Sequence, residues 1–323
     1  MTTSPRIVFL DASTMDGGHF NLDPIASLGD LTLHPTTSPA ETASRVTRAD
    51  IILTNKVVID AAVMDTAGPS LRLVVVCATG VNNIDLDAAT QRGITVCNVS
   101  GYSTASVAQH AIALLLNLAT NAHRYAADAP SLWPRSPIFT RLDHPAVELD
   151  GKTFGVAGLG AIGRATATIA SALGMQVQAL ARDGAAPAAG NTPRLAHDEF
   201  FATSDVISLH CPLTASNEKM LNATTLGLMK PSAFLINTSR GPLVDEPALA
   251  ATLRSGGIAG AALDVLSVEP PPADHPLLAP DIPNLLVTPH TAWMPDESRI
   301  RLIQGVAANI RAFLAGSPIN VVP

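Results

Sequence analysis

The segment GLGAIG at residues 158–163 constrains the fold of this chain more than any other feature. It follows an apolar run, TFGVAGL (153–159), that predicts a strand, and it opens a helical pattern, RATATIASALG (164–174). In that order one glycine permits a tight turn, a second lets the backbone approach a pyrophosphate, and a third lets helix and strand pack closely. The start of the helix attracts the phosphates. This context favours dinucleotide binding over a purely structural turn, and the binding loop comprises Gly158, Leu159, Gly160, Ala161, Ile162 and Gly163.

Strand-like and helix-like segments alternate on both sides of this loop. Apolar runs predict strands at 6–11, 31–35, 50–55, 72–78, 94–99, 175–181, 205–211, 233–239, 258–265 and 284–290. Such nearly continuous apolar runs are typical of parallel sheets that helices cover on both faces. The chain has 323 residues, a length greater than one hydrophobic core accommodates comfortably. Of these residues, 47% are hydrophobic and 15% are charged. We therefore predict an α/β fold with two doubly wound parallel-sheet domains.

A long helical pattern at 103–126 carries the chain into the second domain, and an irregular stretch with several prolines follows at 128–151. This stretch is too hydrophobic for a plain linker, because Trp133, Ile138 and Phe139 need a surface to cover. An arm that packs on a partner subunit and a loop that packs on its own chain both account for these residues.

Composition argues against several classes of protein. The formal net charge is -7, without the basic stripe of a nucleic-acid surface. Cys77, Cys97 and Cys211 show no CxxC or Cys/His spacing, so no metal site is predicted. No apolar run approaches the roughly 20 residues of a membrane helix, and the first residues lack a signal-peptide pattern. We therefore expect a cytoplasmic protein that binds a small molecule, with no nucleic acid and no membrane as partner.

The end of the strand after the glycine loop bears on the form of the dinucleotide. An acidic residue there would accept hydrogen bonds from the ribose hydroxyls of NAD. The strand at 175–181 ends instead in Ala181, and Arg182 follows with donors that suit the 2′-phosphate of NADP. We therefore expect NADP, with NADPH preferred over NADH. A shift of register would instead make Asp183 the ribose acid of an NAD site, and Arg182 as a solvated surface residue is a further alternative.

Three polar residues follow predicted strands in the last third of the chain: Arg240, Glu269 and His290. The carboxyl ends of strands are where ligands bind in open α/β sheets. An arginine can hold a planar carboxylate and polarise a carbonyl, and a histidine can give the carbonyl oxygen a proton as hydride arrives. A nearby glutamate favours the imidazolium form. Singly they could be an ion-pair partner, a loop charge and a core histidine, but together, after a dinucleotide loop, they predict the reduction of a 2-keto acid.

Over essentially its full length the chain resembles the D-isomer specific 2-hydroxyacid dehydrogenase family. The motifs VAGLGAIGR, LHCPLT, LINTSRGPLVDE, DVLSVEP and TPHTAW stand in the family's order and approximate spacing. The resemblance implies that Arg240, Glu269 and His290 are the catalytic arginine, acid and histidine. It also implies a Rossmann dinucleotide-binding domain at 101–290, a smaller flavodoxin-like substrate domain formed by 1–100 plus 291–323, and a homodimer.

The same resemblance assigns further binding residues. Asp264 matches the residue that holds the nicotinamide carboxamide, and three residues match positions that line the cofactor: Thr104, Pro212 and Thr238. The segment CATGVNNID resembles the loop whose amides hold the substrate carboxylate, through Thr79, Gly80 and Val81.

The stretch WPRSPIFTRLDHPAVELDGKT resembles the glycerate dehydrogenase (hydroxypyruvate reductase) branch, which implies reduction of hydroxypyruvate or glyoxylate to D-glycerate or glycolate. A dehydrogenase for a different 2-keto acid is the first alternative. A non-catalytic NAD(P)H sensor is the second, but a binding-only protein has no need to keep the arginine, the glutamate and the histidine together.

Overall fold

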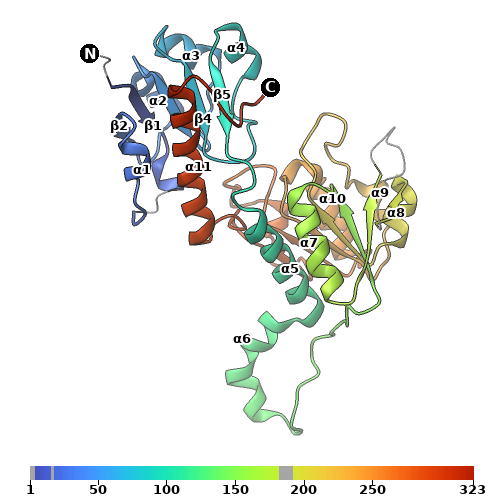
Figure 1. Cartoon of the computed structure of the whole chain (residues 1–323). Coiled ribbons are helices and arrows are strands. Elements are labelled where there is room, and N and C mark those ends of the chain that lie inside the picture. The colour runs from blue at the N-terminus through green and yellow to red at the C-terminus, as the bar shows by residue number, and fades with distance from the viewer. Residues whose placement is uncertain (1–3, 16–17, 182–191) are drawn as a thin grey trace. The chain divides into compact units, whose positions relative to one another are not determined.

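The computed structural model describes residues 4–15, 18–181 and 192–323 (Figure 1). The chain forms two compact units: Met1–Ser103 with Met294–Pro323, called here the first unit, and Thr104–Trp293, called the second unit. Each unit contains one parallel sheet with helices packed against it, which confirms the predicted α/β fold.

The first unit contains a five-stranded sheet in the order β2-β1-β3-β4-β5. This is the flavodoxin-like order, in which the chain reverses its direction of travel beside the first strand. The strands are β1 (Arg6–Phe9), β2 (Asp30–Leu33), β3 (Ile51–Thr54), β4 (Leu73–Val76) and β5 (Thr95–Asn98). The helices are η1 (Ala12–Thr14), α1 (Asp23–Ala26), α2 (Pro39–Val46), α3 (Ala61–Ala67), α4 (Leu86–Gln91) and α11 (Asp296–Leu314).

The second unit contains a seven-stranded sheet in the order β12-β11-β10-β9-β6-β7-β8. Its strands are β6 (Thr153–Ala157), β7 (Gln176–Leu180), β8 (Arg194–Leu195), β9 (Val206–Leu209), β10 (Phe234–Asn237), β11 (Gly260–Leu263) and β12 (Leu285–Val287). Its helices are α5 (Thr104–Thr120), α6 (Ala122–Leu132), η2 (Trp133–Arg135), α7 (Ala161–Ala172), α8 (His197–Thr203), α9 (Ala223–Leu228), η3 (Gly241–Leu243), α10 (Glu246–Arg254) and η4 (Pro276–Leu278). The order reverses at β6, so the loop after β6 lies at the switch point where nucleotides bind in such sheets.

Alternate residues of the central strands fill two hydrophobic layers of the second unit. Ile207 and Leu235 pack with Phe200 and Phe201 of α8 on one face. On the other face, strand residues such as Val156 pack against α5 and α7. Because successive side chains of a strand point to opposite faces, near-continuous apolar runs are what a sheet covered on both sides requires.

The helix predicted over 103–126 differs from the structure. Asn121 adopts the left-handed conformation, with a φ of 52°, which separates α5 from α6. The Nδ2 of Asn121 donates to the carbonyl oxygen of Pro145 at 2.7 Å, so the break is also the point where the returning chain is held. α6 then runs to Leu132 and includes Pro130, so part of the stretch predicted as irregular is helical.

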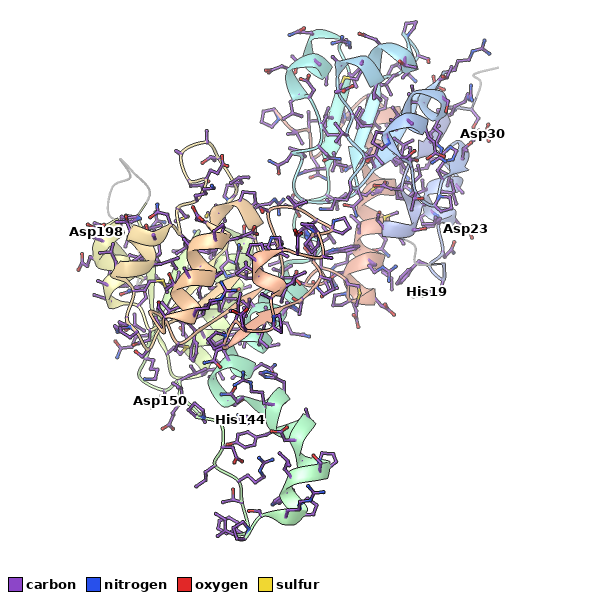
Figure 2. All side chains as sticks on the ribbon, turned by 180° about the vertical axis from the view of Figure 1, so that it is seen from behind. His19, Asp23, Asp30, His144, Asp150 and Asp198 are labelled. Carbon is purple, nitrogen blue, oxygen red and sulfur yellow. The ribbon has the colours of Figure 1, made fainter. Side chains whose placement is uncertain are left out.

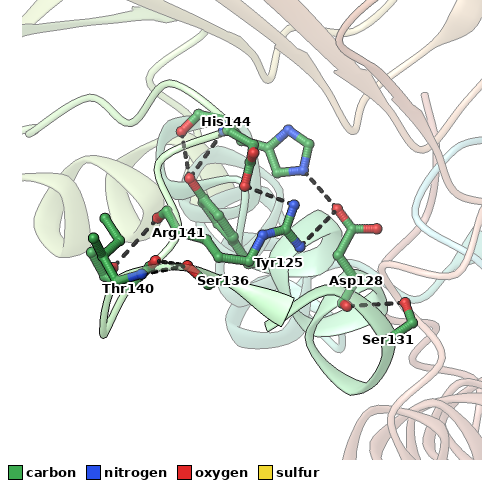
Figure 3. A network of polar contacts seen from close by, with 9 residues as sticks. Tyr125, Asp128, Ser131, Ser136, Thr140, Arg141 and His144 are labelled. Carbon is green, nitrogen blue, oxygen red and sulfur yellow. Dashed lines mark hydrogen bonds and ion pairs between the residues drawn. The ribbon is translucent and has the colours of Figure 1, made fainter. Parts of the chain in front are cut away.

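Residues 122–148, called here the arm, project from the body of the second unit (Figure 1). Figure 2 shows His144 on this projection. No residue of α6 is buried, and a polar network ties α6 to the returning segment (Figure 3). The Tyr125 hydroxyl donates to the His144 carbonyl at 2.9 Å, and Asp128 lies 3.0 Å from the Nε2 of His144. Arg141 pairs with Asp143 at 2.7 Å, so the arm is shaped by its own polar contacts rather than by a core.

None of the helices in the described ranges is both long enough and apolar enough to cross a membrane.

Candidate active site

Every candidate of the second unit that the structure describes lies beside the carboxyl end of a strand, except Thr104 at the start of α5. The glycine loop follows β6, Pro212 follows β9, Thr238 and Arg240 follow β10, Asp264 and Glu269 follow β11, and His290 follows β12. Because all of these strands are parallel, their carboxyl ends share one edge of the sheet. The candidates therefore converge although they are spread over more than a hundred residues of sequence.

His290 and Glu269 form a direct pair. The Nδ1 of His290 lies 2.7 Å from Oε2 of Glu269, and Oε1 of Glu269 accepts a hydrogen bond from the Leu266 amide at 3.0 Å. The two side chains are 27% and 32% exposed, so the pair reaches the surface of the second unit. The arrangement leaves Nε2 of His290 free of the carboxylate and available to a ligand.

The backbone around His290 is fixed by Asp264. His290 has a φ of 54°, in the left-handed region, and its amide donates to the carbonyl of Asp264 at 2.8 Å. The Asp264 side chain accepts from the amides of Thr291 and Ala292, each at 2.9 Å, and from the Thr288 hydroxyl at 2.6 Å. Burial raises the pKa of Asp264, but these hydrogen bonds and that of His110 outweigh it and leave the pKa below its ordinary value. Asp264 is therefore a buried carboxylate that shapes the turn carrying His290.

Close packing explains two of the three glycines of the loop. Gly158 has a φ of 106°, and a β-carbon there would lie 2.6 Å from the amide nitrogen of Cys211. A β-carbon on Gly163 would collide with the carbonyl oxygen of Gly158. A β-carbon on Gly160, in contrast, would meet no atom within 4 Å. The space in front of Gly160 faces the first turn of α7, which has no acidic residue and no side-chain cap.

These features fit a dinucleotide. The unsatisfied amides at the start of α7 suit a pyrophosphate, and Gly160 lets it approach. Thr238 supplies a second sign, because its Oγ1 is buried and has no hydrogen-bond partner among the described residues. Leu159 is half-buried and Pro212 exposed beside the same sheet edge, and Thr104 is half-buried at the start of α5.

Ala181 directly follows β7, whose register pairs Ala179 with Val156. The amide of Ala181 donates to the carbonyl of Leu195 at 2.8 Å, which holds it at the strand end. Ala181 therefore occupies the expected place of the ribose-binding residue. Arg182 and Asp183 lie outside the described residues.

Thr79, Gly80 and Val81 belong to the first unit, where they follow β4. The Thr79 hydroxyl donates to the carbonyl of Val99 at 3.3 Å, and the Thr79 carbonyl accepts from Asn98 at 2.7 Å. These contacts tie the loop to the end of β5.

Polar contacts that the sequence did not reveal support the candidates. His110 of α5 lies 3.0 Å from the Thr288 hydroxyl and 3.4 Å from Asp264. Glu246 accepts from the amide of Ser267 at 2.7 Å, and its carboxylate lies 3.1 Å from Nε2 of His275. The one available signal for His110 was a polar residue within a strongly apolar helical pattern.

The model of the D-isomer specific 2-hydroxyacid dehydrogenase NAD-binding domain matches residues 112–292. A hydroxypyruvate reductase of Blautia hydrogenotrophica is 41% identical over 322 residues, which cover 98% of this chain and 99% of that protein. A glycerate dehydrogenase of Methylorubrum extorquens is 38% identical, with 98% of each chain covered. Among solved structures, an acyclic imino acid reductase in complex with NADPH and D-Arg has a TM-score of 0.86 and 28% identity, covering 98% of this chain and all of that one.

Proposed function

Because the chain belongs to the D-isomer specific 2-hydroxyacid dehydrogenase family, and so transfers hydride between a nicotinamide cofactor and a small 2-hydroxy acid, we propose that it reduces hydroxypyruvate and glyoxylate. The products are D-glycerate and glycolate. Two relatives that align over nearly the whole chain are a hydroxypyruvate reductase and a glycerate dehydrogenase, and this supports the choice of substrate.

The contact that carries the mechanism is the 2.7 Å pair between His290 and Glu269. A bound nicotinamide would supply the hydride for the carbonyl carbon and would be oxidised as the keto acid is reduced. His290 is proposed to give its proton to the carbonyl oxygen. Glu269 accepts the Nδ1–H of His290 and stabilises the imidazolium that donates from Nε2.

Arg240 is proposed to hold the substrate carboxylate and to polarise its carbonyl. A guanidinium presents parallel donors to a planar carboxylate, which orients the substrate as well as binding it. Thr79, Gly80 and Val81 of the first unit are proposed to offer backbone amides to the substrate, and these residues follow β4 at the carboxyl end of a parallel sheet, as ligand loops do.

The glycine loop is proposed to hold the pyrophosphate of the cofactor, with Thr104, Pro212 and Thr238 lining the rest of its site. Asp264 is proposed to accept a hydrogen bond from the nicotinamide carboxamide in addition to its bonds within the chain. The Oγ1 of Thr238 is buried without a hydrogen-bond partner among the described residues, which supports the lining role of Thr238. NADPH is proposed as the preferred form, because Ala181 cannot repel a 2′-phosphate as a carboxylate would.

The enzyme is proposed to be a cytoplasmic homodimer, with the arm as its contact surface. Phe139 is 90% exposed and Leu142 is 81% exposed, and Trp133 and Ile138 are both more than half exposed. Exposed large apolar side chains that lie this close together in the sequence are typical of a protein interface.

A steady-state panel tests the proposed function. Glyoxylate, hydroxypyruvate, pyruvate and a bulkier 2-keto acid are each measured with NADPH and NADH, with the unmodified enzyme and with Arg240→Lys. We expect the highest kcat/KM with hydroxypyruvate or glyoxylate, and a raised KM with a lowered kcat for the variant, because a point charge cannot reproduce a two-point grip. A bulky keto acid as best substrate would contradict the substrate assignment, and unchanged constants for Arg240→Lys would remove Arg240 from the site.

A further inference from the structure

A buried polar group lies behind the His290–Glu269 pair. Glu246 and His275 are each 6% exposed, and their side chains lie 3.1 Å apart. Oε1 of Glu246 accepts from the amide of Ser267 at 2.7 Å, and Oε2 accepts from the hydroxyl of the same serine. A buried carboxylate needs such partners, since an unpaired charge is costly inside a protein.

The orientation of His275 is fixed on its other side. Its Nδ1 accepts a hydrogen bond from the amide of Leu277 at 3.2 Å, as the cap of η4. A nitrogen that accepts carries no proton, so Nε2 holds the proton and donates to Glu246. Both ends of the imidazole are therefore used, and its donor is directed at the carboxylate.

The peptide that Glu246 holds is part of the loop that carries Glu269. Oε1 of Glu269 accepts a hydrogen bond from the amide of Leu266. The next amide along the chain, that of Ser267, is the one that Glu246 binds. Gly241 also packs so closely on the Leu266–Ser267 peptide that a β-carbon there would collide with it. Gly241 and Glu246, the first residue of α10, therefore both hold this loop in place.

We propose that Glu246, held by His275, is a positioning residue for the reaction. It fixes the Leu266–Ser267 peptide, which orients Glu269 so that Oε2 faces His290. This inference rests on the roles proposed above for Glu269 and His290. An acidic residue in the first turn of a helix often only complements the helix dipole. Here both carboxylate oxygens are engaged by Ser267 and His275, neither of which belongs to α10.

Glu246→Gln tests the proposal, because the single oxygen of the amide cannot accept both from the Ser267 amide and from His275, and its NH2 group would face one of these two donors. We expect kcat for keto-acid reduction to fall roughly tenfold or more, since small misplacements of reacting groups cost up to about a hundredfold. The pH profile of kcat/KM should change as well, because the variant disturbs the contact between His290 and Glu269. The dissociation constant for NADPH, measured by fluorescence titration, should not change.

Two variants of His275 separate positioning from folding. Asn can still accept from Leu277 but is too short to reach Glu246, whereas Gln can reach Glu246 but loses the cap of η4. We expect His275→Asn to show the kinetic and pH effects while keeping its melting temperature. His275→Gln should lose thermal stability and keep most of kcat. The reverse pattern would overturn the proposal.

Controls separate this inference from the proposed function. Arg254→Gln breaks an exposed ion pair with Asp281 near the other end of α10 and should leave kcat and the pH profile unchanged. His290→Ala is measured in parallel. An active His290→Ala enzyme overturns the proposed function and this inference with it. An inactive one, together with Glu246→Gln and His275→Asn enzymes of normal kcat and pH profile, overturns the inference alone.

Discussion

Two regions of the second unit are built in opposite ways. At the carboxyl edge of the sheet, polar side chains are held by amides of neighbouring loops, as Asp264 is by Thr291 and Ala292. In the arm, polar side chains such as Arg141 and His144 form the frame, and apolar side chains such as Phe139 face outward.

The difference indicates which region satisfies its polar groups and covers its apolar side chains within one chain. The edge satisfies its buried carboxylate Asp264 internally, and among the described residues it leaves the buried hydroxyl of Thr238 without a partner. The arm orders itself without a core of its own and leaves large apolar side chains uncovered, which is the pattern of a surface that another chain covers.

The largest expected effect concerns the edge. Replacing His290 with Ala removes the proposed proton donor and should lower kcat by roughly 100- to 10,000-fold, the usual range for general acid catalysis. The dissociation constant for NADPH should stay within about twofold, because the glycine loop and not His290 is proposed to hold the pyrophosphate. Stopped-flow absorbance at the nicotinamide band measures both constants. Near-normal turnover would remove His290 from the mechanism and would contradict the assignment of the carboxyl edge as the catalytic region.

The next effect concerns the arm. Phe139→Ser should weaken the proposed homodimer by roughly 30-fold or more, because a central aromatic at an interface contributes about 2 kcal/mol or above. Sedimentation equilibrium of the variant and of Leu314→Ser, an exposed apolar residue outside the arm, measures this. A wild-type protein that sediments as a monomer at micromolar concentration would show that the arm is complete by itself.

A smaller effect tests the claim that buried polar groups at the carboxyl edge of the sheet find their hydrogen-bond partners within the chain. His210 follows β9, its Nε2 lies 2.8 Å from the Ser208 hydroxyl, and burial lowers its pKa to about 4. The folded protein keeps this imidazole neutral, whereas the unfolded chain takes up a proton below about pH 6.5. Stability is therefore fully present above that value and falls as the pH drops towards 4.

The expected loss from this group is about 2 kcal/mol between pH 7 and pH 5. Urea unfolding at both pH values should show a smaller difference for His210→Gln, which can still bond Ser208. Equal pH dependence in both proteins would mean that other groups dominate the acid sensitivity.

Much of the fold could be predicted because it depends on patterns that a single segment displays. The runs at β3, β4, β9 and β10 are buried throughout and mostly apolar, as is typical of strands covered on both faces. The break at Asn121 could not be predicted, since it depends on a contact with Pro145 that no local pattern reveals. β8 has two residues, which is too short for any periodicity.

The candidate site divides in the same way. Arg240, Glu269 and His290 could be found because each follows a strand, and parallel strands bring such residues to one edge. His110, Glu246 and His275 could not, because their roles arise from contacts between loops and helices distant in sequence. Glu246 stands in the same motif as Arg240, yet only the structure relates it to Ser267.

The smallest expected effect concerns the far end of the same edge, where the cofactor's ribose is proposed to lie. Ala181 follows β7 and offers neither an acceptor for the ribose hydroxyls nor a charge against a phosphate. We expect kcat/KM to be higher with NADPH than with NADH by roughly tenfold, the lower bound for one charge-assisted hydrogen bond of about 1.5 kcal/mol. Ala181→Asp should reverse the preference by supplying the ribose acceptor and repelling the phosphate. Ala181→Asn introduces a side chain of the same size as Asp but without its charge, and it should weaken the binding of NADPH much less. A clear NADH preference in the unmodified enzyme would contradict the assignment, and it would mean that a carboxylate beyond Ala181 binds the ribose.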